Sequence, residues 1–152
     1  MEINIIEISK PKIKEREKQI FNPKVKQLPS RDTSFKIMRI VIDENYTRID
    51  FVYNNGRFEW VQIDPKSFIR PAGSDVSYPL IKAVGIPLTP KRHVFKTAKE
   101  TLYYTLYFAA LPKSVKVIDI IEKEIHTPGH HYFNFYGVSM EKIKSKKIEV
   151  GN

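Results

Sequence analysis

The sequence predicts an all-β fold, namely an antiparallel β-sandwich of about eight strands with an extended basic arm at its N-terminus. β-branched and aromatic residues recur in short runs separated by turn-forming residues, and no long segment keeps the apolar period of a helix. Strands and helices do not alternate along the chain, as they would in a parallel α/β fold. The 152 residues, 41% of them hydrophobic, suffice for one domain with one core.

The charge distribution divides the chain into an arm, a body and a tail. Residues 1–31 hold eight basic and four acidic side chains, and residues 141–152 hold four basic and two acidic ones. Of the formal net charge of +9, only +3 therefore lies in residues 32–140. Three prolines interrupt the first segment, so we expect an extended arm at 1–31 with a short helical turn within residues 12–21. We place a β-sandwich domain at 32–140 and a polar basic tail at 141–152.

The body begins with a predicted hairpin. Residues 35–43 are the first strand candidate, and Thr47–Asn54, with its alternating apolar positions, is the second. The dipeptide Asn55-Gly56 tolerates the positive φ that a two-residue hairpin turn requires. The resulting register makes two aromatic cross-strand pairs, Tyr53 with Phe58 and Phe51 with Trp60.

Five further strands are predicted in the rest of the body. They are residues 67–70, 76–84, 101–108, 115–121 and 132–140. Pro79 has no backbone N–H, and we expect it at a sheet edge. Residues 101–108 carry aromatic side chains on both faces, which indicates either a central strand covered on both sides or outer tyrosines that serve an interface. We favour the first, because core packing is the commoner fate of aromatic residues.

Several stretches of the body share the pattern of a known group of domains. They are Trp60-Val61-Gln62-Ile63, Tyr78-Pro79-Leu80 with Gly85-Ile86-Pro87, residues 102–108 with Leu111-Pro112, residues 118–122 and residues 133–138. Together they resemble an uncharacterised bacterial family of small immunoglobulin-like β-sandwich modules, over roughly residues 35–140. The resemblance implies an immunoglobulin-like form of the sandwich and no particular activity, since fold and function are separate questions.

Familiar catalytic patterns are missing from the sequence. With no cysteine, the chain has no thiolate nucleophile, no disulfide framework and no Cys-ligated metal. Its serines fit no nucleophile elbow, and its six glycines form no phosphate loop. Asp119, Glu122 and Glu124 lie too close in sequence to flank a substrate cleft, and we interpret them as solvated acids at strand ends. We therefore expect neither an enzyme nor a cofactor.

Two further groups have both a functional and an ordinary interpretation. His126, His130 and His131 form a metal-like cluster, but adjacent histidines in a strand point to opposite faces, so we favour a polar loop over a zinc site. Trp60 and the tyrosines of residues 101–108 would suit a sugar if they were exposed, and we favour their burial.

The arm supplies the candidate binding residues. Its isoleucines, including Ile6, are costly to leave in water, and pairing with an exposed sheet edge of this molecule or a neighbour would shelter them. The basic residues beyond them would then lie along a partner's acidic surface. The predicted partner-binding residues are Ile3, Ile5, Ile8, Lys10, Lys12, Lys14, Arg16 and Lys18.

These features predict a non-enzymatic interaction or structural module that docks through its arm into a larger protein assembly or a homo-oligomer. The alternative is binding to the RNA or DNA backbone, including ribosomal RNA, by the arm and tail, whose charges sum to +6. Without an evident signal peptide or hydrophobic span, we expect a cytoplasmic protein with neither a membrane partner nor a small-molecule substrate.

Overall fold

The computed structural model describes residues 17–29, 34–54, 59–125 and 132–141, and within them the chain is all-β and antiparallel, as predicted. The strands are β1 (Lys18–Phe21), β2 (Val25–Gln27), β3 (Ser34–Ile42), β4 (Thr47–Asn54), β5 (Trp60–Val61), β6 (Phe68–Pro71), β7 (Tyr78–Val84), β8 (His93–Val94), β9 (Thr101–Phe108), β10 (Val117–Ile121) and β11 (Phe135–Ser139). Among the described residues no helix has the length and apolar character needed to cross a membrane.

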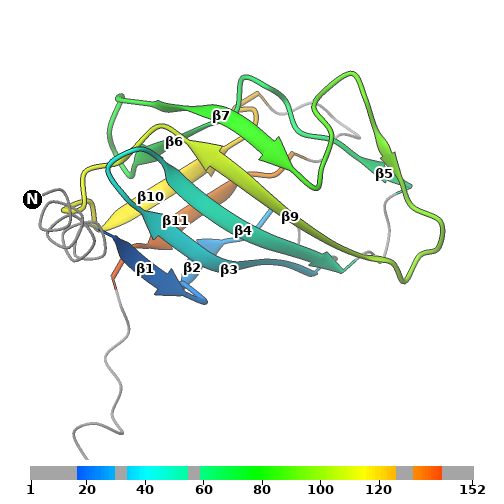
Figure 1. Ribbon diagram of the computed structural model, residues 1–152, viewed down its shortest axis with the longest axis horizontal. Helices are drawn as coiled ribbons and strands as arrows, with labels where there is room; N and C mark the ends of the chain where they lie inside the picture. Colours follow the sequence, from blue (N-terminus) through cyan, green and yellow to red (C-terminus); the bar gives the residue numbers. More distant parts are fainter. Residues whose placement is uncertain (1–16, 30–33, 55–58, 126–131, 142–152) are drawn as a thin grey trace, which may run out of the picture.

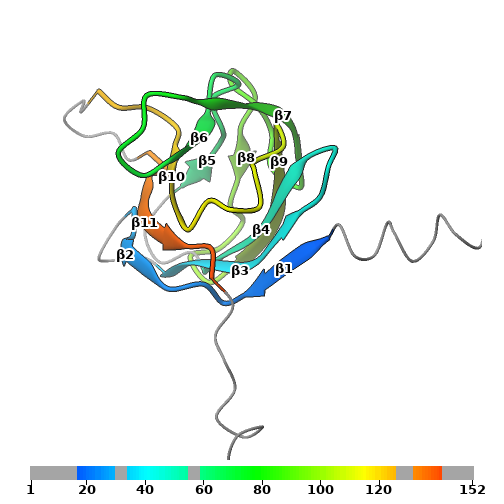
Figure 2. The same ribbon diagram turned by 90° about the vertical axis from the view of Figure 1, so that its left-hand side faces the viewer.

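Nine strands form one sheet that curls around a single core (Figure 1). Their order is β1-β3-β4-β9-β7-β6-β10-β11-β2, while β5 and β8 form a separate two-stranded ribbon. The end view in Figure 2 shows that the curling brings the two ends of the sheet, β1 and β2, to the same side of the molecule. Because β1 and β2 are consecutive, residues 22–24 carry the chain from one end of the sheet to the other.

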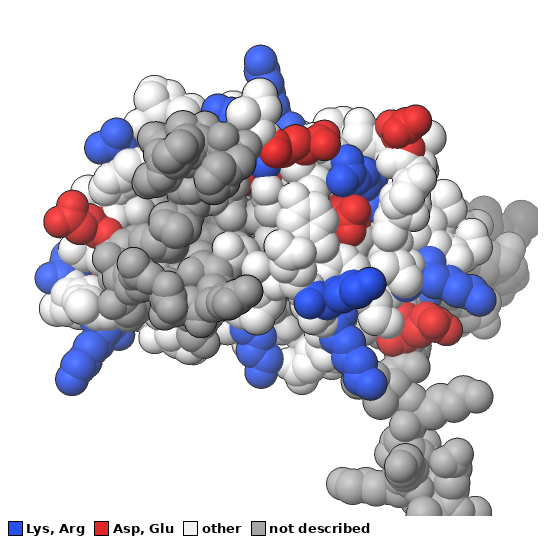
Figure 3. Space-filling model, turned by 180° about the vertical axis from the view of Figure 1, so that it is seen from behind, with Lys and Arg blue, Asp and Glu red and all other residues white. Residues whose placement is uncertain are grey.

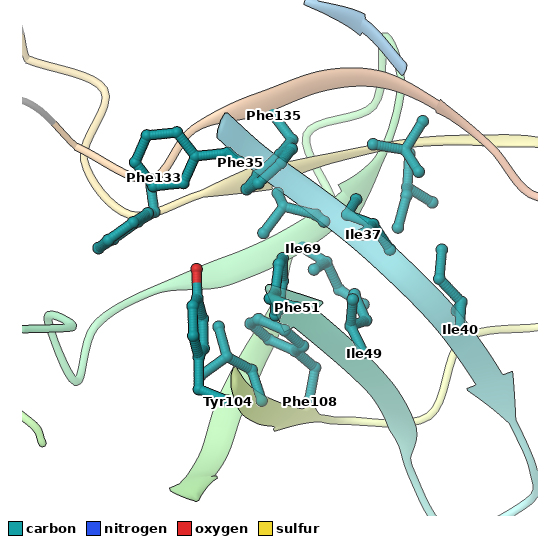
Figure 4. Close-up of a cluster of buried hydrophobic side chains, with 14 of the residues drawn as sticks. Phe35, Ile37, Ile40, Ile49, Phe51, Ile69, Tyr104, Phe108, Phe133 and Phe135 are labelled. Atoms are coloured by element: carbon teal, nitrogen blue, oxygen red, sulfur yellow. The ribbon is translucent and has the colours of Figure 1, made fainter. Parts of the chain in front are cut away.

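Aromatic side chains from opposite parts of the curled sheet meet in the core (Figure 4). Phe51 of β4 stacks on Tyr104 of β9 with ring centroids 4.8 Å apart, and its centroid is 5.4 Å from that of Phe135 on β11. Phe35 of β3 stacks on Tyr53 of β4 at 4.5 Å. Each such side chain contributes roughly 1.5–3 kcal/mol by leaving water, and the contact of Phe51 with Phe135 joins the two sides of the curled sheet.

The predicted pairing of Phe51 with Trp60 is wrong. Phe51 lies opposite Ile37 of β3 on one side and opposite Tyr104 of β9 on the other. Both edges of β4 are therefore occupied, and Trp60 pairs instead with Val94 in the β5–β8 ribbon. The predicted Asn55-Gly56 turn, and Phe58 with it, lie outside the described residues.

The sheet begins earlier than residue 32, where we expected the body to start. β1 pairs with β3, Lys18 lying opposite Ile42, and β2 pairs with β11, Val25 lying opposite Val138. Ile20 is buried in the core, which explains why this part of the predicted arm joins the sheet. The predicted helical turn is accordingly wrong for Lys18–Phe21, which is a strand.

Pro79 does not lie at a sheet edge, because β7 lies between β6 and β9. The Ala109 N–H donates to the Pro79 carbonyl at 2.9 Å, but Pro79 has no N–H to return to the Ala109 carbonyl. The Thr47 hydroxyl donates to that carbonyl instead, at 3.1 Å. A side chain thus replaces the hydrogen bond that proline cannot make, and the sheet continues past it.

Candidate interaction site

A groove of about 220 Å³ opens where the two ends of the sheet face each other. It lies between β2 and the first half of β3, and the β1–β2 turn forms one of its ends. We call this groove the seam. Its lining residues are Asn22, Pro23, Val25, Leu28, Phe35, Lys36 and Ile37.

One free strand edge borders the seam, that of β2. On the other side of the seam β1 pairs with residues 39–42 of β3, and β4 pairs with β3 from Ser34 to Ile42. β2 pairs with β11 and ends the sheet. The Asn22 N–H donates to the Met38 carbonyl at 2.9 Å, which closes the seam at the β1 end. Free edges of this kind offer backbone groups that can pair with an added strand.

Exposed apolar side chains surround the seam. Phe21 and Met38, which adjoin lining residues in the chain, are 58% and 39% exposed, and Leu28 in the lining is 43% exposed. Phe35 and Ile37 form a buried apolar floor. Exposed apolar side chains beside a sheet edge are typical of a site that binds another chain segment.

The rim of the seam is basic. Lys36 lies in the lining, Lys24 and Lys26 lie on either side of Val25, and all three are exposed. None of them forms an ion pair with another described residue. Figure 3 shows Lys and Arg side chains spread along the lower margin of the molecule, the side on which β1 and β2 lie in Figure 1. An apolar floor with a basic rim favours an extended segment that carries apolar and acidic side chains.

Of the predicted partner-binding residues, Lys18 is the one that the structure describes. It begins β1, and its Nζ donates to the Lys113 carbonyl at 3.3 Å. Ile3, Ile5, Ile8, Lys10, Lys12, Lys14 and Arg16 lie outside the described residues, so their role stays a prediction, as does nucleic-acid binding by the arm and tail. His126, His130 and His131 also lie outside them, and the described part of the chain holds no group of three or more His, Asp or Glu side chains placed to bind a metal.

The outer face of β9 is not covered, contrary to our preference for cover on both sides. Leu102, Tyr104, Leu106 and Phe108 are buried, whereas Tyr103 is 64% exposed. The ring of Tyr107 has Lys82 Nζ 4.7 Å from its centroid. The physical reason is that the curled sheet encloses one core, so only its inner face is buried.

A network of charged and polar groups occupies this outer face. Asp50 accepts hydrogen bonds from Arg39 Nε at 3.0 Å, Arg48 Nε at 2.9 Å and the Thr105 hydroxyl at 2.7 Å. Desolvation acts to raise the pKa of Asp50, but these three hydrogen bonds outweigh it and hold the pKa below its ordinary value. One carboxylate thus holds both guanidinium groups in place, and the cluster of Arg39, Arg48 and Asp50 keeps a net charge of +1.

Trp60 is likewise already in contact with a cation. The guanidinium of Arg92 lies 4.0 Å from the centroid of the Trp60 ring, and Trp60 is half-buried in the β5–β8 ribbon. A cation held over an aromatic ring is a stabilising contact in its own right. The arrangement gives the sugar-binding interpretation of Trp60 no support, because one face of the ring is occupied.

Asp119 and Glu122 are not solvated acids at strand ends, as the sequence suggested. Both are 8% exposed. Glu122 accepts the N–H groups of Asp64 and Phe133, one on each carboxylate oxygen and each at 2.9 Å. Burial raises the pKa of Glu122 to about 7, even though these two hydrogen bonds act to lower it.

The two buried acids tie separate segments of the chain together. Asp119 accepts the Gly137 N–H at 3.0 Å and Arg70 Nε at 3.3 Å, which links β10 to β11 and β6. The physical reason for the burial of both acids is that backbone N–H groups outside the ladder need acceptors where water is excluded. Both carboxylates therefore position backbone, and neither lines the seam. Comparison with protein-family models, with curated proteins and with solved structures finds no match for this chain.

Proposed function

We propose that this protein is a non-enzymatic interaction module that binds an extended protein segment at the seam and docks through its N-terminal arm into a larger assembly or a homo-oligomer. The observation that carries the proposal is the seam itself, where the edge of β2, which ends the sheet, borders an apolar floor and a basic rim. Strand addition at such an edge gains main-chain hydrogen bonds, and the groove selects the side chains.

The N-terminal arm contains apolar side chains whose burial a sheet edge would allow. Four isoleucines lie within residues 1–9, and burial of each isoleucine side chain is worth roughly 1.5–3 kcal/mol. The basic residues between Lys10 and Lys18 separate these isoleucines from β1, the first strand of the described body. The module thus combines a segment that requires a sheet edge with a body that offers one.

We further propose that the fold is immunoglobulin-like. The order β3-β4-β9-β7 corresponds to strands A-B-E-D of that fold, and β6-β10-β11 corresponds to C-F-G, with each strand in its expected place along the chain. In this assignment β1 is added beside strand A and β2 beside strand G. The seam then lies between the added strand β2 and strand A, at the point where the N-terminal residues join the body.

Three substitutions in the full chain test the proposed function, namely Ile3→Asp, Ile5→Asp and Ile8→Asp together. We call this triple substitution the arm variant. The wild-type chain is expected to assemble, either as the pure protein, measured by light scattering, or in the extract of the cells that produce it. The arm variant is expected to remain a monomer. Its circular dichroism spectrum should equal that of the wild type.

Val76→Asp is the matched control, because Val76 is an exposed apolar residue on the β6–β7 connection and does not line the seam. It should assemble as the wild type does. The proposal is refuted if the arm variant assembles to the same extent as the wild type. It is also refuted if the wild-type chain is a monomer both as the pure protein and in the cell extract. Deletion of residues 1–31 is a poor substitute, because it removes β1 and β2 from the sheet.

A further inference from the structure

We infer that the outward side of β3, β4, β9 and β7 binds a single-stranded nucleic acid, with phosphate groups on Arg39 and Arg48 and an unpaired base stacked on Tyr103. We call this side of the four strands the outer face. The strands are neighbours in the sheet and lie next to one another in Figure 1. The inference uses neither the seam nor the N-terminal isoleucines, so it and the proposed function stand or fall separately.

The outer face is positively charged. The four strands contain four basic residues and one acidic residue, which leaves a net charge of +3. The register places all five charged side chains on the same side of the sheet as the exposed Tyr103, because residues directly opposite each other in neighbouring strands point to the same face. They belong to three rows across the sheet, namely Lys36 with Val52 and Tyr103, Arg39 with Asp50 and Thr105, and Arg48 with Tyr107 and Lys82.

Arg39 and Arg48 are held in place for binding a phosphate group. Asp50 accepts Arg39 Nε at 3.0 Å on one carboxylate oxygen and Arg48 Nε at 2.9 Å on the other. The terminal nitrogens of both guanidinium groups form no hydrogen bond within the part of the chain that the structure describes, and the two side chains are 32% and 34% exposed. A guanidinium that is fixed at Nε loses little freedom when its remaining N–H groups bind a phosphate.

Tyr103 offers an aromatic ring on which a base can stack. It is 64% exposed and lies on β9, between β4 and β7. Among the described residues no cation and no other aromatic ring contacts the ring of Tyr103. The ring of Tyr107 differs, because Lys82 Nζ lies 4.7 Å and the Arg48 guanidinium 5.8 Å from its centroid. An open ring beside positively charged groups is the arrangement that single-stranded nucleic acids recognise.

The spacing of these groups suits one short strand of nucleic acid. Along β9, Tyr103 is two residues from the row that contains Arg39 and four residues from the row that contains Arg48. At ~3.3 Å per residue these separations are roughly 7 Å and 13 Å. A duplex keeps the ring faces of its bases inside the base stack, so it would leave Tyr103 without a stacking partner. An acidic protein segment would match the positive charge but has no base to stack on the ring.

Fluorescence anisotropy of labelled oligothymidylate and oligouridylate of about 12 nucleotides, titrated with the full chain, tests the inference. The wild type should bind at least one of them. Its affinity should fall at least about fifteenfold between about 50 mM and about 200 mM NaCl, because about three phosphate contacts release counterions. Tyr103→Ala should weaken binding at least about fivefold without changing the salt dependence, since it removes a stacking contact and no charge. Tyr103→Phe keeps the ring and should bind as the wild type does.

Arg39→Gln and Arg48→Gln test the phosphate contacts. Each should weaken binding about fivefold to tenfold at about 50 mM NaCl and reduce the slope of log affinity against log salt by about 0.7. Lys66→Gln is the matched control, because Lys66 is an exposed basic residue on the β5–β6 connection, outside the four strands. It loses the same charge and should bind as the wild type does. Circular dichroism of each variant confirms that it is folded.

The inference is overturned if the wild type binds neither oligonucleotide at about 50 mM NaCl. It is also overturned if Tyr103→Ala and both arginine variants bind as tightly as the wild type, because the arm and tail would then account for the binding. Two further measurements use competitors. If Tyr103→Ala weakens binding to a duplex as much as binding to the single strand, or if polyglutamate displaces the probe as well as the unlabelled oligonucleotide does, the outer face does not recognise unpaired bases.

Weaker binding of all three variants, with an unchanged control, supports the inference.

Discussion

Raising the pH from about 5 to about 8 should destabilise this protein through one carboxyl group, that of Glu122. Burial raises the pKa of Glu122 from its ordinary value of 4.5 to about 7. The folded state therefore holds the proton more tightly than the unfolded state does. The stabilisation is complete below pH 4.5, decreases as the pH rises through 7, and is lost above that pH.

The magnitude follows from the difference between the two pKa values. From 4.5 to about 7 is a change of 2.5, and at about 1.4 kcal/mol per pKa unit the charged carboxylate costs about 3 kcal/mol in the folded state. Most of this loss of stability falls between pH 5 and pH 8, a range that begins just above the lower pKa and ends about one unit above the higher one. Folding lowers the pKa values of Asp50 and Glu100, so the contribution of these two groups to the free energy of unfolding changes only at more acidic pH, outside this window.

Urea denaturation of the wild type and of Glu122→Gln across this pH range measures the effect. Glutamine does not titrate, so the stability of the variant should not change with pH through this position. Its side-chain nitrogen cannot accept the N–H group of Asp64 or Phe133, so the variant should be about 1–3 kcal/mol less stable than the wild type near pH 5. By pH 8 the wild type should have lost about 3 kcal/mol, so the variant should become as stable as the wild type or more stable. A difference that stays constant across the range would refute the reasoning.

Three further predictions concern stability and use chemical denaturation as the assay. Gly85→Ala should cost about 2 kcal/mol or more, because Gly85 has a φ of +86° and an added Cβ would lie 2.7 Å from the Tyr103 carbonyl oxygen. Gly73 has a φ of +81° but open space around it, so Gly73→Ala should cost only about 1 kcal/mol. Equal costs for the two substitutions would contradict a clash between the added Cβ of residue 85 and the Tyr103 carbonyl oxygen. Phe51→Ala should cost about 3–5 kcal/mol, against less than about 0.5 kcal/mol for Tyr103→Ala on the exposed face of β9. Asp50→Asn should cost about 1 kcal/mol at neutral pH, and this cost should fade as the pH falls below 3.8, since the pKa of Asp50 is lowered by folding.

The sequence predicts strands better than it predicts their partners. The alternating apolar residues of β4 and β9 located these strands, because successive side chains of a half-buried strand point alternately to the core and to solvent. Pairing depends instead on which edges are free in the folded molecule. The Asn55-Gly56 signal suggested a partner for β4, but β3 and β9 already occupy both of its edges, and Trp60 pairs elsewhere.

The candidate site was missed because its elements are short and its surroundings are charged. β1 buries one isoleucine, Ile20, between polar neighbours, and it pairs with β3 more than 17 residues along the chain. Their charge and the prolines among them assigned these residues to an arm. The burial of Glu122 was missed for a similar reason, since it depends on backbone groups of Asp64 and Phe133 that come from distant segments. A signal was present in Val25 and Leu28, two apolar residues among lysines, which mark a surface that is partly covered.

The seam exists because the chain leaves the edge of β3 after four residues. Asn22 adopts a φ of 48°, and Pro23 follows it and has no N–H to continue the ladder, so β1 ends at Phe21 and the chain turns toward β11. Had β1 continued, it would have run beside residues 35–37 of β3, where the seam now lies. The exposed lysines beside the edge of β2 repel one another, which discourages two such edges from pairing directly.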